Sequence, residues 1–224
     1  MRPSWHGTMG AMDLTEAVSR RRMVRRFDAD RAVPFETVER LVALAQRAPS
    51  AGHTQGWDVL ALTSAQDRER FWEVSREETA TEPGQSSPWL RGVSAAPVLL
   101  VMLADPTAYL DRYAEPDKGW TDRSPDRWPI PYWDTDTAMA AMVILLGAVD
   151  AGLGALFFGV PAGRHDAVRA AYAVPPGRRV VGVIALGHEA RRVRSLSLRR
   201  GRRPLGDVLH HGTFGASAAG TSEP

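Results

Sequence analysis

Apolar residues recur along this chain with two different periods, and each period predicts a different kind of element. Between residues 34 and 48 they follow the three- and four-residue spacing of an amphipathic helix, with Pro34 in its first turn. Residues 97–103 are instead nearly all apolar, as in a central strand buried on both faces. The same criteria predict further helices over 15–22 (with Thr15 as its cap), 65–79, 135–151 and 164–173, and strands over 57–62, 155–160 and 179–187. Helices outweigh strands, so the pattern predicts an α+β fold.

Residues 105–133 show neither period. They combine five prolines with six aromatic rings spread among charged residues: Tyr109, Tyr113, Trp120, Trp128, Tyr132 and Trp133. A long irregular segment in a compact domain is usually a functional lid or a disordered insertion. Because disordered segments contain few aromatic residues, we predict an ordered lid here, with packing in the core as the alternative for any single ring.

At 224 residues the chain fits one sizeable domain, or half of a core that a partner chain completes. We place this domain at residues 13–211, between a disordered leader (1–12) and a disordered tail (212–224). An apolar stretch at 205–209, beyond the last strand, suggests contact with a second subunit. No apolar run reaches the roughly 18 residues of a membrane span, and the chain has neither a secretory signal nor a cysteine. These features favour a cytoplasmic protein without disulfides, thiolate chemistry or membrane contact.

Charge and motifs exclude several further classes. Only Lys118 among the 28 basic residues is a lysine, yet the net charge is only +2, which argues against a nucleic-acid partner. His210 and His211 beside Asp207 lack the ligand spacing of a metal site, so no metal is predicted. The chain also lacks the serine-hydrolase nucleophile elbow and the glycine fingerprint of a dinucleotide-binding unit.

Two segments carry the candidate chemistry. Residues 20–27 form an arginine cluster that ends in an aromatic ring, and a persisting helix would put Arg21 and Arg25 on one side, where they could hold a phosphate. A solvated helix end is the alternative. Residues 49–55 form a small-residue turn followed by imidazole, hydroxyl and amide groups, where a planar ligand could approach the backbone. A plain connecting loop is the alternative there.

The order of these two segments resembles the nitroreductase family, whose pattern is Arg-Arg-Ser-x-Arg-x-Phe followed by Ala-Pro-Ser-x-x-Asn-x-Gln-x-Trp. The stretches 134–142, 152–159 and 200–205 resemble the family's central helix, its glycine-bounded strand and its terminal basic motif. The resemblance implies a mainly antiparallel sheet flanked by helices in an intertwined homodimer, with FMN at the subunit interface. The implied FMN contacts are Arg21, Arg22, Met23, Arg25, Pro49, Ser50, Ala51, Gln55, Phe158, Gly159, Arg200 and Arg202.

The resemblance further implies that NADH or NADPH reduces the flavin, which then passes electrons to a nitroaromatic, quinone or related small acceptor. The flavin carries the chemistry, so no side-chain acid or base is predicted to be catalytic. Three residues depart from the pattern: Met23 replaces a serine, His53 an asparagine and Gly56 a proline. The lid residues predicted to choose the acceptor are Tyr113, Trp120, Trp128 and Trp133. A dedicated flavin-dependent dehydrogenase or dehalogenase, and a flavin-sequestering protein without turnover, are the alternatives.

Overall fold

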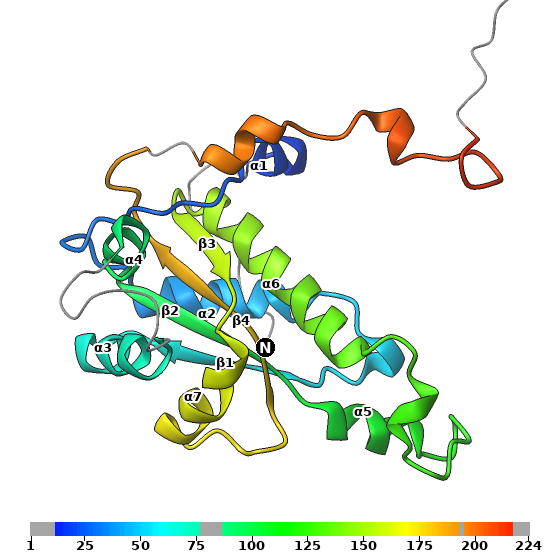
Figure 1. Ribbon diagram of the computed structural model, residues 1–224. Coiled ribbons are helices and arrows are strands. Elements are labelled where there is room, and N and C mark those ends of the chain that lie inside the picture. Colours follow the sequence, from blue (N-terminus) through cyan, green and yellow to red (C-terminus); the bar gives the residue numbers. More distant parts are fainter. Residues whose placement is uncertain (1–11, 77–86, 193–194, 217–224) are drawn as a thin grey trace, which may run out of the picture. The chain divides into compact units, whose positions relative to one another are not determined.

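The computed structural model describes residues 12–76, 87–192 and 195–216 (Figure 1). These residues form two compact units, divided after Arg192. The helices of the first unit are α1 (Leu14–Arg20), α2 (Phe35–Ala45), α3 (Ala65–Val74), α4 (Pro88–Val93), α5 (Pro106–Tyr113), α6 (Tyr132–Asp150) and α7 (His165–Ala171). Its strands are β1 (Trp57–Leu62), β2 (Val98–Ala104), β3 (Gly154–Phe158) and β4 (Arg179–Gly187). Residues 1–11 and 217–224, assigned above to a leader and a tail, lie outside the described residues.

The four strands form one antiparallel sheet in the order β1-β2-β4-β3, which confirms the predicted α+β class and mainly antiparallel sheet. In the centre of the sheet, Leu100 of β2 lies opposite Ala61 of β1 and Ile184 of β4. Every residue of β2 is buried, as its uninterrupted apolar sequence predicts.

Alternate residues of the central strands enter two separate apolar clusters, one on each face of the sheet. Leu100 packs with α2 and α6, whereas Val101 packs with α3, α4 and α7. Helix α6 (light green in Figure 1) is the longest, and its apolar residues pack against α2 and the sheet. The predicted buried central helix is therefore confirmed, although it begins at Tyr132 rather than at residue 135.

The first helix differs from its prediction at both ends. Its cap is Asp13, whose carboxylate accepts hydrogen bonds from the amides of Thr15 and Glu16, so the assignment of Thr15 as cap was wrong. The helix ends at Arg20 because the chain then becomes extended and pairs with β3, the Val24 amide donating to the Ala155 carbonyl at 2.9 Å. The arginine cluster is therefore not helical beyond Arg20.

Residues 105–133 are more regular than predicted. The segment opens with α5, in which Pro106 occupies the first turn, and it contains a 3-10 turn at Pro125–Arg127. The expectation of wholly irregular structure was wrong for these parts. Helix α3 ends at Val74, and residues 77–79 of its predicted span lie outside the described residues.

The second unit contains two 3-10 turns, at Leu196–Arg200 and Leu205–Asp207. The side chains of Leu205, Val208 and Leu209 are exposed. Within residues 12–76, 87–192 and 195–216, no helix combines the length and the hydropathy that crossing a bilayer requires.

Candidate functional site

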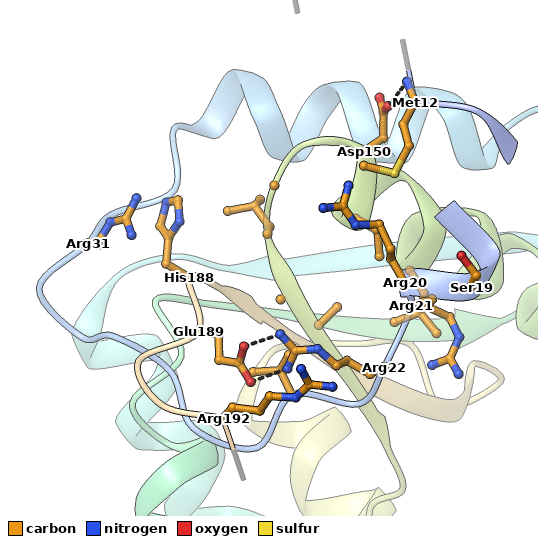
Figure 2. A pocket seen from close by; sticks show the side chains of 17 residues that line it. Met12, Ser19, Arg20, Arg21, Arg22, Arg31, Asp150, His188, Glu189 and Arg192 are labelled. Atoms are coloured by element: carbon orange, nitrogen blue, oxygen red, sulfur yellow. Dashed lines mark hydrogen bonds and ion pairs between the residues drawn. The ribbon is translucent and has the colours of Figure 1, made fainter. Parts of the chain in front are cut away.

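A cavity of about 840 Å³ opens in the first unit beside the extended segment that follows α1 (Figure 2). The end of α6, the glycine-rich turn into β3 and the residues after β4 also line it. Its charged lining comprises the arginines Arg20, Arg21, Arg22, Arg31 and Arg192 and the carboxylates Asp150 and Glu189. Cationic groups exceed carboxylates, so the cavity favours an anionic ligand.

Neighbouring arginines behave differently in this cavity. Arg22 forms a two-pronged ion pair with Glu189, and the hydrogen bonds between them raise the pKa of Arg22 and lower that of Glu189. The Nη1 atom of Arg21 is buried and, among the described residues, has no hydrogen-bond partner. A buried guanidinium nitrogen without a partner is costly in the free protein. It fits an anionic group such as a phosphate, which would supply the missing acceptor.

The extended segment continues along the edge of β3. The Phe157 amide donates a long hydrogen bond, 3.5 Å, to the thioether sulfur of Met23, and Arg25 Nη1 donates to the Met23 carbonyl at 3.0 Å. Phe158 stacks on Trp72 with ring centroids 5.5 Å apart, and the exposed Gly159 follows it. Four predicted contacts, Met23, Arg25, Phe158 and Gly159, therefore lie on or beside β3 and its end.

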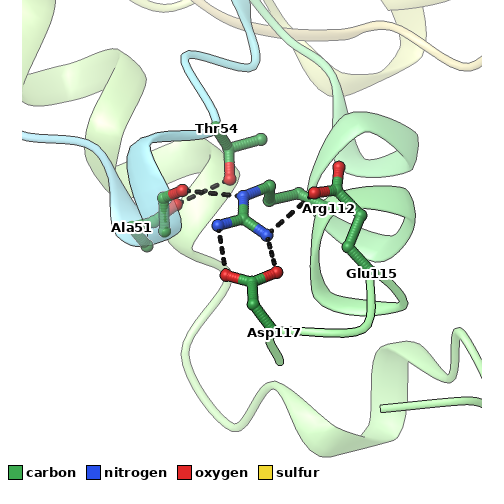
Figure 3. A network of polar contacts seen from close by, with 6 residues as sticks. Ala51, Thr54, Arg112, Glu115 and Asp117 are labelled. Atoms are coloured by element: carbon green, nitrogen blue, oxygen red, sulfur yellow. Dashed lines mark hydrogen bonds and ion pairs between the residues drawn. The ribbon is translucent and has the colours of Figure 1, made fainter. Parts of the chain in front are cut away.

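The turn at residues 49–55 adopts an uncommon backbone. His53 and Gln55 both have φ of 54°, in the left-handed region that glycine prefers and that costs other residues about 1–2 kcal/mol each. The backbone amide of Gln55 donates to Ser50 Oγ at 2.8 Å. Arg112 Nε donates to the Gly52 carbonyl at 3.0 Å, within the network that Figure 3 shows. Such outliers persist where the surrounding contacts fix them, as these hydrogen bonds do.

Asp136, on the second turn of α6, lies under this turn and is only 1% exposed. Its Oδ2 atom accepts from the Ala51 amide at 2.8 Å and from the hydroxyl of Tyr109 at 2.7 Å. Asp136 lies in the stretch 134–142 that resembles the family's central helix, and no role was predicted for it. The available signal was a carboxylate inside a helix predicted to be buried, since such a group needs hydrogen-bond partners.

The predicted lid aromatics pack mainly on one another. Trp128 and Trp133 are 9% and 8% exposed and form a buried cluster with Tyr109. Tyr113 and Trp120 are half-buried and pack against that cluster, with the Tyr113 ring centroid 4.6 Å from that of Trp128. Burial of this degree supports the core interpretation for Trp128 and Trp133, whereas Tyr113 and Trp120 are only half-buried, with the Arg127 guanidinium 5.5 Å from the centroid of the Trp120 ring.

Charged residues of the lid also find partners. Arg112 forms a two-pronged pair with Asp117 at 2.7 and 2.8 Å and reaches Glu115 at 3.1 Å. The hydrogen bonds from Arg112 lower the pKa of Asp117. Lys118 lies over the Tyr113 ring, 5.3 Å from its centroid.

The predicted residues thus form two groups at opposite ends of α6. Asp150, at its end, lines the arginine cavity, whereas Asp136, near its start, contacts the 49–55 turn. At 1.5 Å per residue, the 14 positions between them span about 21 Å. Pro49 is exposed at the start of the turn, and Arg200 and Arg202 are exposed in the second unit.

Comparison with known proteins gives a consistent picture. Residues 18–188 match the model of the Nitroreductase family. A Methanothermobacter thermautotrophicus protein, provisionally named NADH dehydrogenase/NAD(P)H nitroreductase, is 26% identical over 186 residues, covering 82% of this chain and 81% of that protein. A Clostridium difficile nitroreductase family protein of known structure is 19% identical, with 91% of this chain and 100% of that chain covered and a TM-score of 0.66. The structure of NfrA1 nitroreductase from B. subtilis is 18% identical and has a TM-score of 0.69, with 90% of this chain and 75% of that chain covered.

Proposed function

The chain belongs to the nitroreductase family and is an oxidoreductase, and we propose that it binds FMN and transfers electrons from NADH or NADPH to a small acceptor. The observation that carries the proposal is the unpaired, buried Nη1 of Arg21 in a cavity with excess positive charge. A phosphate at this position would give that nitrogen its acceptor and neutralise the cavity. Nitroaromatics and quinones are the acceptor classes that we favour.

Two copies of the chain are needed in this proposal. The arginine cavity and the 49–55 turn are separated by about 21 Å along α6, so one flavin reaches both groups most simply when a second chain supplies the turn. Exposed apolar side chains on α1 and α6, among them Val18, Met139 and Met142, support an interface between chains. We therefore propose a homodimer with FMN between the subunits.

FMN, when bound, supplies the redox chemistry, and the protein binds, orients and shields it. Arg21 would hold the phosphate, and Arg200 and Arg202 remain predicted FMN contacts from the sequence pattern. Arg25, fixed to the Met23 carbonyl, would place a cation beside the ring where negative charge develops. Phe158 and Gly159 would offer backbone along the ring.

The exposed parts of the half-buried Tyr113 and Trp120 side chains would contact a planar acceptor. Replacing Trp120 by alanine should therefore raise the KM for aromatic acceptors while leaving the FMN content of the purified protein unchanged. Loss of FMN from a folded Trp120→Ala protein would contradict this assignment.

The absorption spectrum of the purified protein tests the central claim. We expect the visible bands of an oxidised flavin, and mass analysis of the material released on denaturation should give FMN. Anaerobic NADH or NADPH should then bleach the visible band, and a quinone should restore it. A protein that stays colourless after incubation with excess FMN would refute the proposal.

The residue at position 23 supports a second candidate function, flavin storage. Met23 places a thioether, already in contact with the Phe157 amide, where the family pattern has a serine hydroxyl. That substitution removes one hydrogen-bonding group near the ring and favours flavin storage without turnover. Binding of FMN without bleaching by either nicotinamide cofactor would select this alternative.

A further inference from the structure

A directed chain of hydrogen bonds crosses the 49–55 turn and ends on α6. A carboxylate only accepts hydrogen bonds, so the Tyr109 hydroxyl must donate to Asp136 Oδ2, 2.7 Å away. The Tyr109 oxygen can then accept from the hydroxyl of Ser50, 3.4 Å away, and Ser50 Oγ in turn accepts from the Gln55 amide at 2.8 Å. Asp136 therefore sets the direction of both hydroxyl hydrogen bonds in this chain.

Several contacts make Asp136 the anchor of the turn. The same Oδ2 atom also accepts from the Ala51 amide at 2.8 Å, so both ends of the turn depend on one oxygen. Asp136 is 1% exposed and Tyr109 is fully buried, so water does not compete for these bonds. Burial is the largest cause that raises the pKa of Tyr109 above its ordinary value, and the hydroxyl therefore remains a donor at neutral pH.

The turn needs such an anchor because its backbone is unfavourable by itself. Two residues that are not glycine, His53 and Gln55, occupy the left-handed region, and Gly52 joins them with φ of 62°. A free loop with this sequence would relax toward more populated conformations. An ordered turn presents its polar groups without an additional entropic cost when a ligand binds.

We infer that Asp136 is a positioning residue that holds the 49–55 turn in its binding conformation through Ala51, Tyr109 and Ser50. The inference rests on the proposed function, in which this turn contacts FMN. It has a corollary for Ser50: its hydroxyl proton points to Tyr109 and one of its lone pairs accepts from the Gln55 amide, so the turn offers FMN its backbone groups and the remaining Ser50 lone pair.

Three variants test the inference. Asp136→Asn keeps one oxygen that can accept both hydrogen bonds, removes the charge and replaces the other oxygen by an amide NH2 group. Asp136→Leu fills a similar space and leaves both donors without a partner. Thr137→Val is the matched control, because Thr137 is equally buried on α6 but its hydroxyl donates only to the Trp133 carbonyl of its own helix, at 2.6 Å.

Amide hydrogen exchange over residues 50–56 of the flavin-free protein is the first measurement, and the dissociation constant for FMN is the second. Asp136→Leu should speed exchange and weaken FMN binding by about tenfold or more, as expected when buried donors lose their acceptor. For Asp136→Asn, the exchange rate and the dissociation constant for FMN should both stay within about threefold of the parent values. Thr137→Val should change neither the exchange rate nor the dissociation constant, although it lowers thermal stability.

Parent-like exchange in Asp136→Leu, or equal effects of Asp136→Leu and Thr137→Val, would overturn the inference. If Asp136→Leu does not fold, Tyr109→Phe replaces it in the test, because that change removes only the hydroxyl. Parent-like amide exchange at Gln55 in Tyr109→Phe would then contradict the inference. Exchange is measured without flavin, so it decides the role of Asp136 even if the parent protein fails to bind FMN and the proposed function falls.

Discussion

Replacing Arg21 by methionine should weaken FMN binding and should not destabilise the flavin-free protein, although the arginine is half-buried. The Nη1 atom of Arg21 is buried and lacks an acceptor, and an unsatisfied buried donor costs about 1–3 kcal/mol. Methionine keeps much of the apolar stem and removes that donor. We therefore expect the flavin-free variant to gain about 1 kcal/mol, a rise of about 2–4 °C in the melting temperature of a chain of this size.

The effect on FMN has the opposite sign. A hydrogen bond from a guanidinium to a phosphate contributes about 2–3 kcal/mol when it is shielded from water, so its loss should raise the dissociation constant roughly 30- to 150-fold. Arg26→Met is the matched control: it removes the same charge from the same segment, but its side chain is exposed and lies outside the arginine cavity. Its dissociation constant for FMN should stay within about threefold of the parent.

Fluorescence titration of FMN into flavin-free protein gives the dissociation constants, and calorimetry of the same samples gives the melting temperatures. The reasoning fails if Arg21→Met and Arg26→Met weaken binding equally, because net charge alone would then explain the loss. It also fails if flavin-free Arg21→Met is clearly less stable than the parent, since Arg21 would then have a structural partner in the free protein.

Three further predictions concern stability and order. Arg22→Met should lower the free energy of unfolding by about 0.5–1 kcal/mol at pH 7. Because Arg22 lowers the folded-state pKa of Glu189, this difference should vanish as the pH falls through that pKa. Urea midpoints at neutral and acidic pH would reveal the loss. Gly182→Ala should lower the free energy of unfolding by about 1–3 kcal/mol, because the new methyl group would lie 2.3 Å from the Phe157 ring. Urea denaturation of the double variant should show that adding Phe157→Leu restores most of the lost stability. Arg112→Met should speed amide exchange over residues 115–120 several-fold, because the carboxylates it holds lose their donor; unchanged exchange would show that the lid is ordered by its aromatic rings alone.

Sequence patterns predicted the sheet well because they report burial directly. The apolar run at 97–103 gave β2 and its two buried faces, and the Pro34 region gave α2 to within a few residues. The arginine cluster was misjudged because its conformation depends on a partner 131 residues away, where the Val24 amide meets the Ala155 carbonyl. No local spacing encodes that pairing.

The family was predictable from the sequence, but the arrangement of the candidate site residues was not. The order of the two segments identified the family, which the match over residues 18–188 confirms. That Arg22 pairs with Glu189 while Arg21 keeps an unpaired nitrogen depends on the backbone bridge between Phe27 and Glu189, two residues beyond β4. Helix α5 was missed although Pro106 after an aspartate is a recognisable helix start, because the many prolines beyond it dominated the interpretation.

Features that destabilise the free chain are concentrated beside the residues assigned to FMN and its acceptor. Of the five buried side-chain polar atoms without a partner in the described residues, one belongs to Arg21, and one to Trp72, whose ring stacks on Phe158. Two more are the indole nitrogens of Trp128 and Trp133. The left-handed residues of the 49–55 turn belong to the same set of unfavourable features.

Proteins tolerate unfavourable groups at functional sites because ligand contacts, rather than internal contacts, satisfy them. The two classes present here differ in what relieves them. Arg21 lacks an acceptor, which a bound phosphate can supply, whereas the strained turn already has its anchor in Asp136 and needs no ligand to stay ordered. FMN should therefore stabilise the protein chiefly through the arginine cavity, and Arg21→Met should abolish most of the FMN-induced rise in melting temperature while Asp136→Asn retains it.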